Sequence, residues 1–259
     1  MVRSAPMGYD REVYWSEVAG RMAQRTSRRD VAGDADAYYA YKRRKMLRRF
    51  LATLPVDDRE VLELGCGPGG NLEWLLNHRR PRRVIGVDIA STMLNLAAER
   101  LSDRARLHKA DGRTIPMPDR SVDLAFTVTV LQHNVEDGHM QAMVCELARV
   151  SRHTVVLIED VVPVGRPALR GESWIGRPTA EYEVAGRSAG LRLVGSEALR
   201  TRLTRAGLNV LSRVFAGRAE GTTRPALFSA LLAAWVTVAK HCDDWVADGN
   251  LTKLTFVRD

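Results

Sequence analysis

The sequence predicts an α/β protein with a largely parallel sheet and helices on both faces. Short apolar runs alternate with helical patterns between residues 60 and 159, the arrangement expected of parallel strands joined by right-handed crossovers. A glycine-rich turn follows the first of these runs, where a buried strand would give way to a helix. The chain has 259 residues, which is long enough for one domain with a large core.

Residues 1–55 precede the first strand and are predicted to form an N-terminal helical cap. Helical patterns cover residues 11–25 and 37–54, and aromatic side chains are frequent in both. Those side chains could pack the cap onto the sheet or form a lid over a pocket. Residues 56–259 then make up the main predicted domain, with a helical insertion at about 200–250.

Five parallel strands and their helices are expected in alternating order. The strands cover residues 60–64, 83–88, 105–110, 122–127 and 154–159. The helices between them cover residues 70–78, 91–101 and 136–150. The second of these helices has apolar residues at positions 94, 97, 98 and 101, which form one face that can be buried against the sheet.

The pattern changes after the fifth strand. A helix over residues 179–190 leads into a sixth strand at 191–197, and two helical patterns at about 203–216 and 225–241 form the insertion. Residues 251–257 then form a terminal strand. We expect it to pair with the sixth strand as an antiparallel edge.

The composition indicates a globular protein and places limits on its partners. The formal net charge is +8, but only five of the 39 basic residues are lysines and the arginines are spread along the chain. Such a charge is more often a solvated surface than a nucleic-acid site. The longest apolar stretch, residues 226–239, is too short to span a bilayer, so no membrane partner is expected.

The three cysteines indicate a reducing environment. Cys66, Cys145 and Cys242 lie far apart and contain no CxxC pair, so they predict neither a zinc site nor a disulfide framework, and no metal is expected. No apolar run near Met1 resembles a signal peptide. The expected location is therefore the cytoplasm.

The glycine-rich turn is the strongest sign of a ligand. The first strand ends near Glu63, and four glycines follow within residues 65–70. Glycines let the chain turn sharply and let a ligand approach the backbone. Asp88 ends the second strand, where a carboxylate can accept from a ribose diol. These features fit any cofactor that contains adenosine.

Four motifs in order narrow the choice. ELGCGPGG at residues 63–70 resembles the first motif of the class I S-adenosylmethionine-dependent methyltransferases, and VIGVDIASTML at 84–94 resembles their ribose motif. ADGRTIPMPDRSVD at 110–123 and VLQH at 130–133 are similar to passages of the UbiE-like (methyltransferase type 11) small-molecule branch. The resemblance covers residues 60–160. It implies a Rossmann-like seven-stranded sheet, mostly parallel, with an antiparallel last strand, and S-adenosyl-L-methionine as cofactor.

The resemblance also implies roles for individual residues. The loop glycines would contact the methionine part of the cofactor, and Glu63 would orient the loop or a water near the ammonium. Asp88 would bind the ribose hydroxyls, while a further set would hold the adenine. Arg43 is our candidate for the cofactor carboxylate, with Lys42 behind it; a solvated helix face is the alternative. The glycines are Gly65, Gly67 and Gly69, and the adenine set is Ile89, Met93, Asp111 and Gly112.

Candidate catalytic groups follow the fourth and fifth strands. His133 could remove a proton from the acceptor, and Asp160 or Glu159 could instead hold an acceptor amine or hydroxyl. A lone histidine is more often structural, so this assignment stays open. Aromatic side chains are expected to wall the acceptor pocket: Tyr9, Tyr14, Trp15, Tyr39 and Trp174.

The predicted function is methyl transfer to oxygen or nitrogen of a small, specialised metabolite. One alternative is an RNA methyltransferase that uses the arginine clusters at residues 42–49 and 79–83. Another is a non-catalytic cofactor-binding module with residues 226–239 as an interface. A nicotinamide dehydrogenase is least favoured, because Glu63 and the Asp111 passage have no role in it. Monomer and homodimer are both compatible with the sequence.

Overall fold

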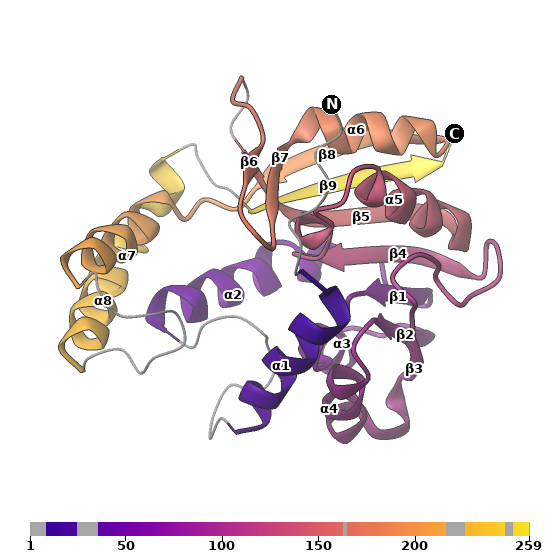
Figure 1. The fold of residues 1–259 in the computed structure, drawn as a ribbon, viewed down its shortest axis with the longest axis horizontal. Coiled ribbons are helices and arrows are strands. Elements are labelled where there is room, and N and C mark those ends of the chain that lie inside the picture. The colour runs from indigo at the N-terminus through magenta and orange to yellow at the C-terminus, as the bar shows by residue number, and fades with distance from the viewer. Residues whose placement is uncertain (1–8, 25–35, 163–164, 216–225, 247–250, 259) are drawn as a thin grey trace.

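The computed structural model describes residues 9–24, 36–162, 165–215, 226–246 and 251–258. Its central sheet has the strand order β3-β2-β1-β4-β5-β9-β8, as Figure 1 shows. The first five of these strands are parallel to one another, and β9 is antiparallel to both of its neighbours. The strands are β1 (Glu60–Leu64), β2 (Arg83–Asp88), β3 (Arg106–Lys109), β4 (Val122–Val128), β5 (Ser151–Val162), β8 (Leu191–Ala198) and β9 (Leu251–Arg258). The predicted fold class is therefore confirmed.

The position of β9 differs from the prediction. It lies between β5 and β8, so β8 and not β9 is the edge of the sheet. The reason is the burial of β9, whose Leu254 and Phe256 are fully buried. An edge strand would leave such side chains poorly covered.

A short hairpin extends the sheet beside the carboxyl end of β5 and was not predicted. It consists of β6 (Leu169–Arg170) and β7 (Ile175–Pro178). Strand β7 runs parallel to the last residues of β5, where Val161 pairs with Arg177. The hairpin therefore stands next to the end of the sheet at which β4 and β5 finish.

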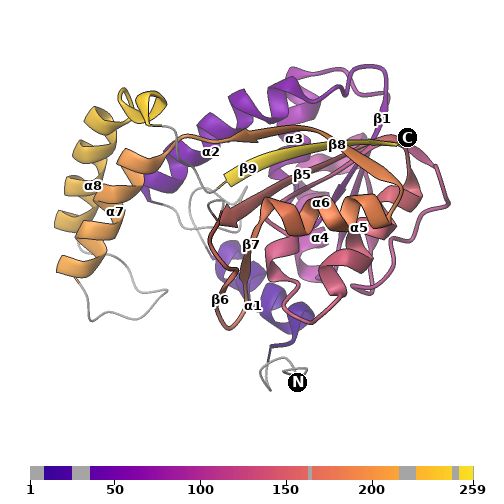
Figure 2. The same cartoon turned by 90° about the horizontal axis from the view of Figure 1, so that it is seen from above.

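Helices cover both faces of the sheet, as predicted (Figure 2). On one face α5 (His139–Val150) and α6 (Thr179–Ser188) bury a core that includes Leu62, Ile85 and Leu157. On the other face α3 (Gly70–His78), α4 (Ser91–Leu101) and the short 3-10 helix η1 (Leu51–Thr53) pack on Val61 and Phe126. Adjacent strand residues thus point to opposite cores, as the period of a strand requires.

The two helices of the predicted N-terminal cap lie in different places. Helix α1 (Arg11–Ala23) packs on α4 through Val18, Ala19 and Met22. Helix α2 (Ala37–Arg49) instead packs with α7 (Arg202–Val214) and α8 (Ala226–Ala239), the two insertion helices. The helices α2, α7 and α8, which we call the helical lobe, stand to one side of the sheet in Figure 1. The division of the chain into a cap at 1–55 and a main domain stays a prediction.

Candidate active site

The candidate site lies where β1 and β4 end side by side. The strand order reverses between them, and in open α/β sheets ligands bind at such a switch point. Three segments meet there: the glycine loop after β1, the end of β2, and the loop that connects β4 to the 3-10 helix η3 (Leu131–His133). Helices α1 and α2 each send basic side chains to this end of the sheet.

The three predicted loop positions require glycine for different structural reasons. All have positive φ, namely 70° at Gly65, 51° at Gly67 and 80° at Gly69. A Cβ on Gly65 would lie 2.3 Å from Cγ2 of Val130, and one on Gly69 would lie 2.9 Å from Cδ1 of Leu101. Those two glycines are therefore also needed for protein packing. At Gly67 a Cβ would meet no described neighbour within 4 Å, so this backbone can face a ligand.

Glu63 is a fully buried carboxyl under the loop. Its Oε1 accepts from Nδ2 of Asn71 at 2.7 Å, and Oδ1 of Asn71 accepts from Nη1 of Arg43 at 2.8 Å. The other oxygen, Oε2, is buried without a hydrogen-bond partner among the described residues. Burial raises the pKa of Glu63 to about 8, although Asn71 and Arg43 oppose the shift. An unsatisfied buried oxygen of this kind is suited to a cationic group.

Asp88 joins the glycine loop to the start of α4. Its Oδ2 accepts from the backbone N–H of Gly67 at 2.8 Å, and its Oδ1 accepts from that of Ala90 at 2.9 Å. Burial raises the pKa of Asp88, and these backbone donors act in the opposite direction. Each carboxylate oxygen can accept two hydrogen bonds, so acceptor capacity remains on both.

The residues expected around the adenine are held in three different ways. The carboxylate of Asp111 is exposed and accepts from the backbone of Arg113 and Thr114, so it organises a turn, the alternative role left open by its place before a glycine. Gly112 has a φ of 77°, and the side chain of Ile89 packs directly against it. Met93 is buried beneath α1.

His133 is held by both of its ring nitrogens. Nδ1 lies 2.8 Å from the carbonyl oxygen of Ser173, and Nε2 lies 3.3 Å from the side-chain nitrogen of Gln132. With the proton on Nδ1, both contacts are normal hydrogen bonds. Burial lowers the pKa of His133, which favours the neutral ring.

The two carboxylates at the end of β5 are also engaged. Glu159 is fully buried and accepts from Oγ1 of Thr127 at 2.7 Å and from the backbone N–H groups of Val130 and Gln132. It therefore fixes the loop after β4, and burial raises its pKa to about 7. Asp160 forms an ion pair with Lys42 of α2, with Nζ and Oδ1 3.1 Å apart.

The predicted aromatic residues are partly brought together. The rings of Tyr9, Tyr14 and Trp15 contact one another in sequence, and Trp15 contacts His133 edge to face with centroids 4.9 Å apart. Trp174 lies next to Ser173, which accepts from His133. Tyr39 packs against Tyr38 and the core of the helical lobe.

Two site residues were not predicted. Asn71 connects Glu63 to Arg43, and its place directly after the glycines was the available signal. Arg11 of α1 contacts the ring of His139 and donates to Oδ1 of Asn134 at 3.4 Å. It thereby ties α1 across the β4–α5 connection, and no local pattern marks it because its partners lie more than a hundred residues away.

These residues fit a cofactor that combines a ribose with a charged amino-acid end. Asp88 retains acceptor capacity for a diol, Oε2 of Glu63 faces no described donor, and the backbone of Gly67 is open. The fold and the loop together define a Rossmann-like enzyme domain that binds an adenosine cofactor at the switch point.

The comparisons with known proteins agree. Residues 61–154 match the methyltransferase domain family. The chain is 29% identical to a malonyl-acyl-carrier-protein O-methyltransferase of Marinomonas sp. (strain MWYL1) over 73% of its own length and 67% of that protein. It is 42% identical to a trans-aconitate 2-methyltransferase of Rhodopseudomonas palustris (strain BisB18) over 26% of its length and 28% of that protein.

A solved structure extends the likeness in fold to the whole chain. The cyclase SpnF superposes with a TM-score of 0.65 at 17% identity, covering 100% of this chain and 99% of that one. At this identity the likeness concerns the fold alone. The chain resembles the class I enzymes in motifs and fold, and it is an S-adenosylmethionine-dependent methyltransferase whose cofactor is S-adenosylmethionine.

Proposed function

We propose that this enzyme methylates an oxygen of a small carboxylic acid. The observation that carries the proposal is the engagement of all three candidate bases. His133 is bonded at both nitrogens, Glu159 holds the loop after β4, and Asp160 is paired with Lys42. A carboxylate is already a nucleophile near neutral pH and needs no base.

The relatives support the same class of acceptor. The malonyl-acyl-carrier-protein and trans-aconitate enzymes are named for acceptors that carry free carboxyl groups. Their names describe those proteins, and only 28% of the length of the second is matched here. A small acid nevertheless agrees with a site at which Lys42 of α2 reaches the end of β5.

The proposed cofactor contacts follow from the loop. Asp88 holds the ribose hydroxyls, Oε2 of Glu63 faces the ammonium, and the backbone at Gly67 lies along the methionine chain. Arg43, one hydrogen bond from Asn71, is proposed for the cofactor carboxylate. Bound S-adenosylmethionine supplies an electrophilic methyl group on a sulfonium. The adenine is assigned to Ile89, Met93, Asp111 and Gly112.

The protein's part in the reaction is positioning. The acceptor carboxylate is already ionised, so no residue has to remove a proton, and the side chains of the site would hold its oxygen in line with the methyl group that the cofactor would supply. Alignment of the two reactants can supply much of the rate, because it replaces a bimolecular encounter with a fixed geometry. Trp15 and His133 form one wall near this point, and Tyr9, Tyr14, Trp174 and Tyr39 complete the proposed set.

The test combines an acceptor search with one variant. Extract metabolites are incubated with enzyme and cofactor, and mass spectrometry identifies which gain a methyl. His133→Asn keeps a donor near the carbonyl of Ser173. With an acid acceptor, this variant should retain kcat within about threefold, and kcat should stay flat above about pH 6.

Three results would overturn the proposal. A loss of about a hundredfold in kcat for His133→Asn, with cofactor binding unchanged, would make His133 a base and point to a hydroxyl or amine acceptor. Methylation of added RNA in a salt-dependent manner would favour the arginine clusters. Cofactor binding without transfer to any metabolite would favour a binding module.

A further inference from the structure

Helix α8 has an unusual surface for a helix at the outside of a protein. It contains no charged residue over Ala226–Ala239, and only one side of it is buried. That side, formed by Phe228, Leu232 and Val236, packs on α2 and α7. Helices that are apolar on all sides are normally buried, so the outer side of α8 requires an explanation.

The outer side of α8 is one continuous apolar stripe. Leu227 is 61% exposed, Leu231 43%, Trp235 44% and Val238 71%. Their spacing of four, four and three residues places them on the same face of the helix. These side chains therefore form a ridge along the outside of the helical lobe.

Helix α7 continues this surface. The ring of Trp235 lies over Gly207 of α7, and Phe215 contacts Phe228 with centroids 5.7 Å apart. The two contacts set an antiparallel register in which exposed valines of α7 lie level with Leu231 and Leu227 of α8. We call the combined set the apolar face: Val210, Val214, Leu227, Leu231, Trp235 and Val238.

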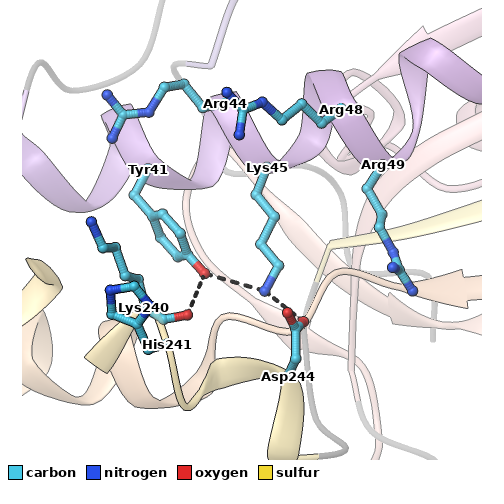
Figure 3. Close-up of a pocket in the computed structure, with 8 residues that line it drawn as sticks. All are labelled: Tyr41, Arg44, Lys45, Arg48, Arg49, Lys240, His241 and Asp244. Atoms are coloured by element: carbon cyan, nitrogen blue, oxygen red, sulfur yellow. Dashed lines mark hydrogen bonds and ion pairs between the residues drawn. The ribbon is translucent and has the colours of Figure 1, made fainter. Parts of the chain in front are cut away.

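The helical lobe carries an excess of basic residues. Helix α2 has six basic residues and α7 has three, and none of the three lobe helices contains a carboxylate. Three of the α2 cations are paired with carboxylates from other elements, namely Lys42 with Asp160, Lys45 with Asp244 and Arg49 with Glu197. Between α2 and the end of α8 lies a cleft of about 580 Å³ whose lining includes Arg44, Arg48 and Lys240, as Figure 3 shows. Lys45 is paired with Asp244 at its floor, but the positive charges exceed the negative ones.

Charge decides which partner fits the apolar face. A second copy of the chain would bring two basic lobes together, and like charges oppose such an interface. A nucleic acid would satisfy the cations but would leave the leucines and Trp235 in water. An anionic bilayer satisfies both, because apolar side chains enter the boundary of the acyl region while cations remain at the headgroups.

We propose that the helical lobe docks this enzyme on the surface of an anionic phospholipid membrane. The apolar face enters the interface, and Arg44, Arg48 and Lys240 at the cleft pair with headgroup phosphates. This differs from the expectation of no membrane partner, which considered only spanning segments. In the part of the chain that the structure describes, no helix is long and apolar enough to cross a bilayer, and surface docking requires none.

The test uses the intact protein and sedimentation with vesicles. We expect binding to vesicles of phosphatidylcholine with phosphatidylglycerol and little binding to phosphatidylcholine alone. Leu227→Ser/Leu231→Ser/Val238→Ser should lower the partition coefficient at least about tenfold. Its matched control is Leu169→Ser/Val184→Ser/Val194→Ser, whose residues are 56%, 53% and 48% exposed elsewhere and which should bind normally.

Charge is tested by a second pair of variants. Arg44→Gln/Arg48→Gln/Lys240→Gln should also lower binding about tenfold or more. Arg82→Gln/Arg170→Gln/Arg187→Gln removes the same charge from side chains that are 61%, 62% and 66% exposed outside the lobe, and it should have little effect.

Several outcomes would overturn the proposal. Equal binding to both vesicle types, or equal losses in a variant and its control, would show that the lobe has no special role. Light scattering that reveals a dimer, converted to monomer by Leu227→Ser/Leu231→Ser/Val238→Ser, would assign the face to a second copy. RNA binding that needs the three cations but not the apolar residues, without vesicle binding, would favour a nucleic acid.

Discussion

The two sides of the site are held together in different ways. On the side of β1 and β2, the contacts join residues close in sequence: Asn71 and Glu63 are eight apart, and Gly67 and Asp88 are 21 apart. On the side of β4 and β5, Lys42 and Asp160 are 118 apart, and Arg11 and His139 are 128 apart. The first side is a local backbone structure; the second depends on where whole helices pack.

This difference has a chemical counterpart. On the first side, the buried carboxylate of Asp88 accepts from the backbone N–H groups of Gly67 and Ala90 and so fixes the glycine loop. On the second side, Glu159 fixes the loop after β4 in a similar way. The ion pair and the aromatic contact supplied there by α2 and α1 can change with small shifts of those helices. We therefore expect substitutions on the first side to affect cofactor binding and those on the second to affect the acceptor.

The largest effect is expected from Asp88→Ala. The variant removes the acceptor for the N–H groups of Gly67 and Ala90, together with the proposed partner of the ribose. Affinity for S-adenosylhomocysteine should fall about a hundredfold or more in calorimetry. Asp103→Ala, an exposed acid after α4, is the control and should bind normally. Unchanged affinity in Asp88→Ala would show that Asp88 and the loop it fixes do not contribute to cofactor binding.

Glu63→Gln tests the buried carboxyl on the same side. The pKa of Glu63 is about 8 in the folded protein and 4.5 in the unfolded reference. The folded state therefore retains the proton longer, and the stability that Glu63 contributes below pH 4.5 is lost as the pH rises toward 8. Between pH 5 and pH 8, the free energy of unfolding should fall by about 3 kcal/mol less in the variant than in the parent, as measured in urea titrations.

The control for this measurement is Glu99→Gln, at an exposed position of α4. Its free energy of unfolding should change with pH as that of the parent protein does. If the free energy of unfolding of Glu63→Gln also changes as in the parent, Glu63 is ionised in the folded state and the burial argument is wrong.

Lys42→Met addresses the second side. Asp160 would lose its partner and repel an acid acceptor, so kcat/KM for that acceptor should fall about tenfold while cofactor affinity stays the same. Lys42→Met/Asp160→Asn should recover most of the loss. Lys45→Met, one turn along α2 and paired with Asp244, is the matched control. A loss of cofactor affinity in Lys42→Met would remove the distinction between the two sides.

The smallest effect is expected from Arg11→Gln. Its guanidinium ties α1 to Asn134 and His139, so the variant should lower the free energy of unfolding by about 1 kcal/mol. Hydrogen exchange should become faster in α1 and stay unchanged in β1. Arg21→Gln, exposed on the last turn of α1, should alter neither. Faster exchange throughout the sheet would mean that α1 is not an independent part of the site.

The same contrast explains what the sequence could predict. The five parallel strands and the glycine loop were predicted because periodicity and short motifs act over a few residues. The place of β9 was missed because strand order depends on burial across the whole sheet. The motifs named Glu63 and Asp88, but the role of Gly65 depended on Val130, which approaches it only after folding.

The contacts on the second side, that of β4 and β5, could not be predicted from periodicity and short motifs. Nothing near Arg11 indicates His139, and nothing near Tyr39 indicates that its ring packs against Tyr38 and the core of the helical lobe. Both contacts depend on how the helices that carry them, α1 and α2, are oriented against the rest of the protein. Asp111 shows a further limit, since the same residue before a glycine suits a turn and an adenine contact equally well.

The attachment of the insertion has a consequence for how this enzyme can diversify. Helices α7 and α8 leave the sheet after β8 and return at β9, and these strands are neighbours: Ala198 pairs with Thr252, and the N–H of Leu199 donates to the carbonyl of Leu251 at 2.7 Å. The two ends of the insertion are therefore as close together as the two ends of a hairpin turn. The intervening helices can thus be exchanged for a short loop or another module without a break in the sheet, and the glycine loop after β1 lies outside the exchanged segment.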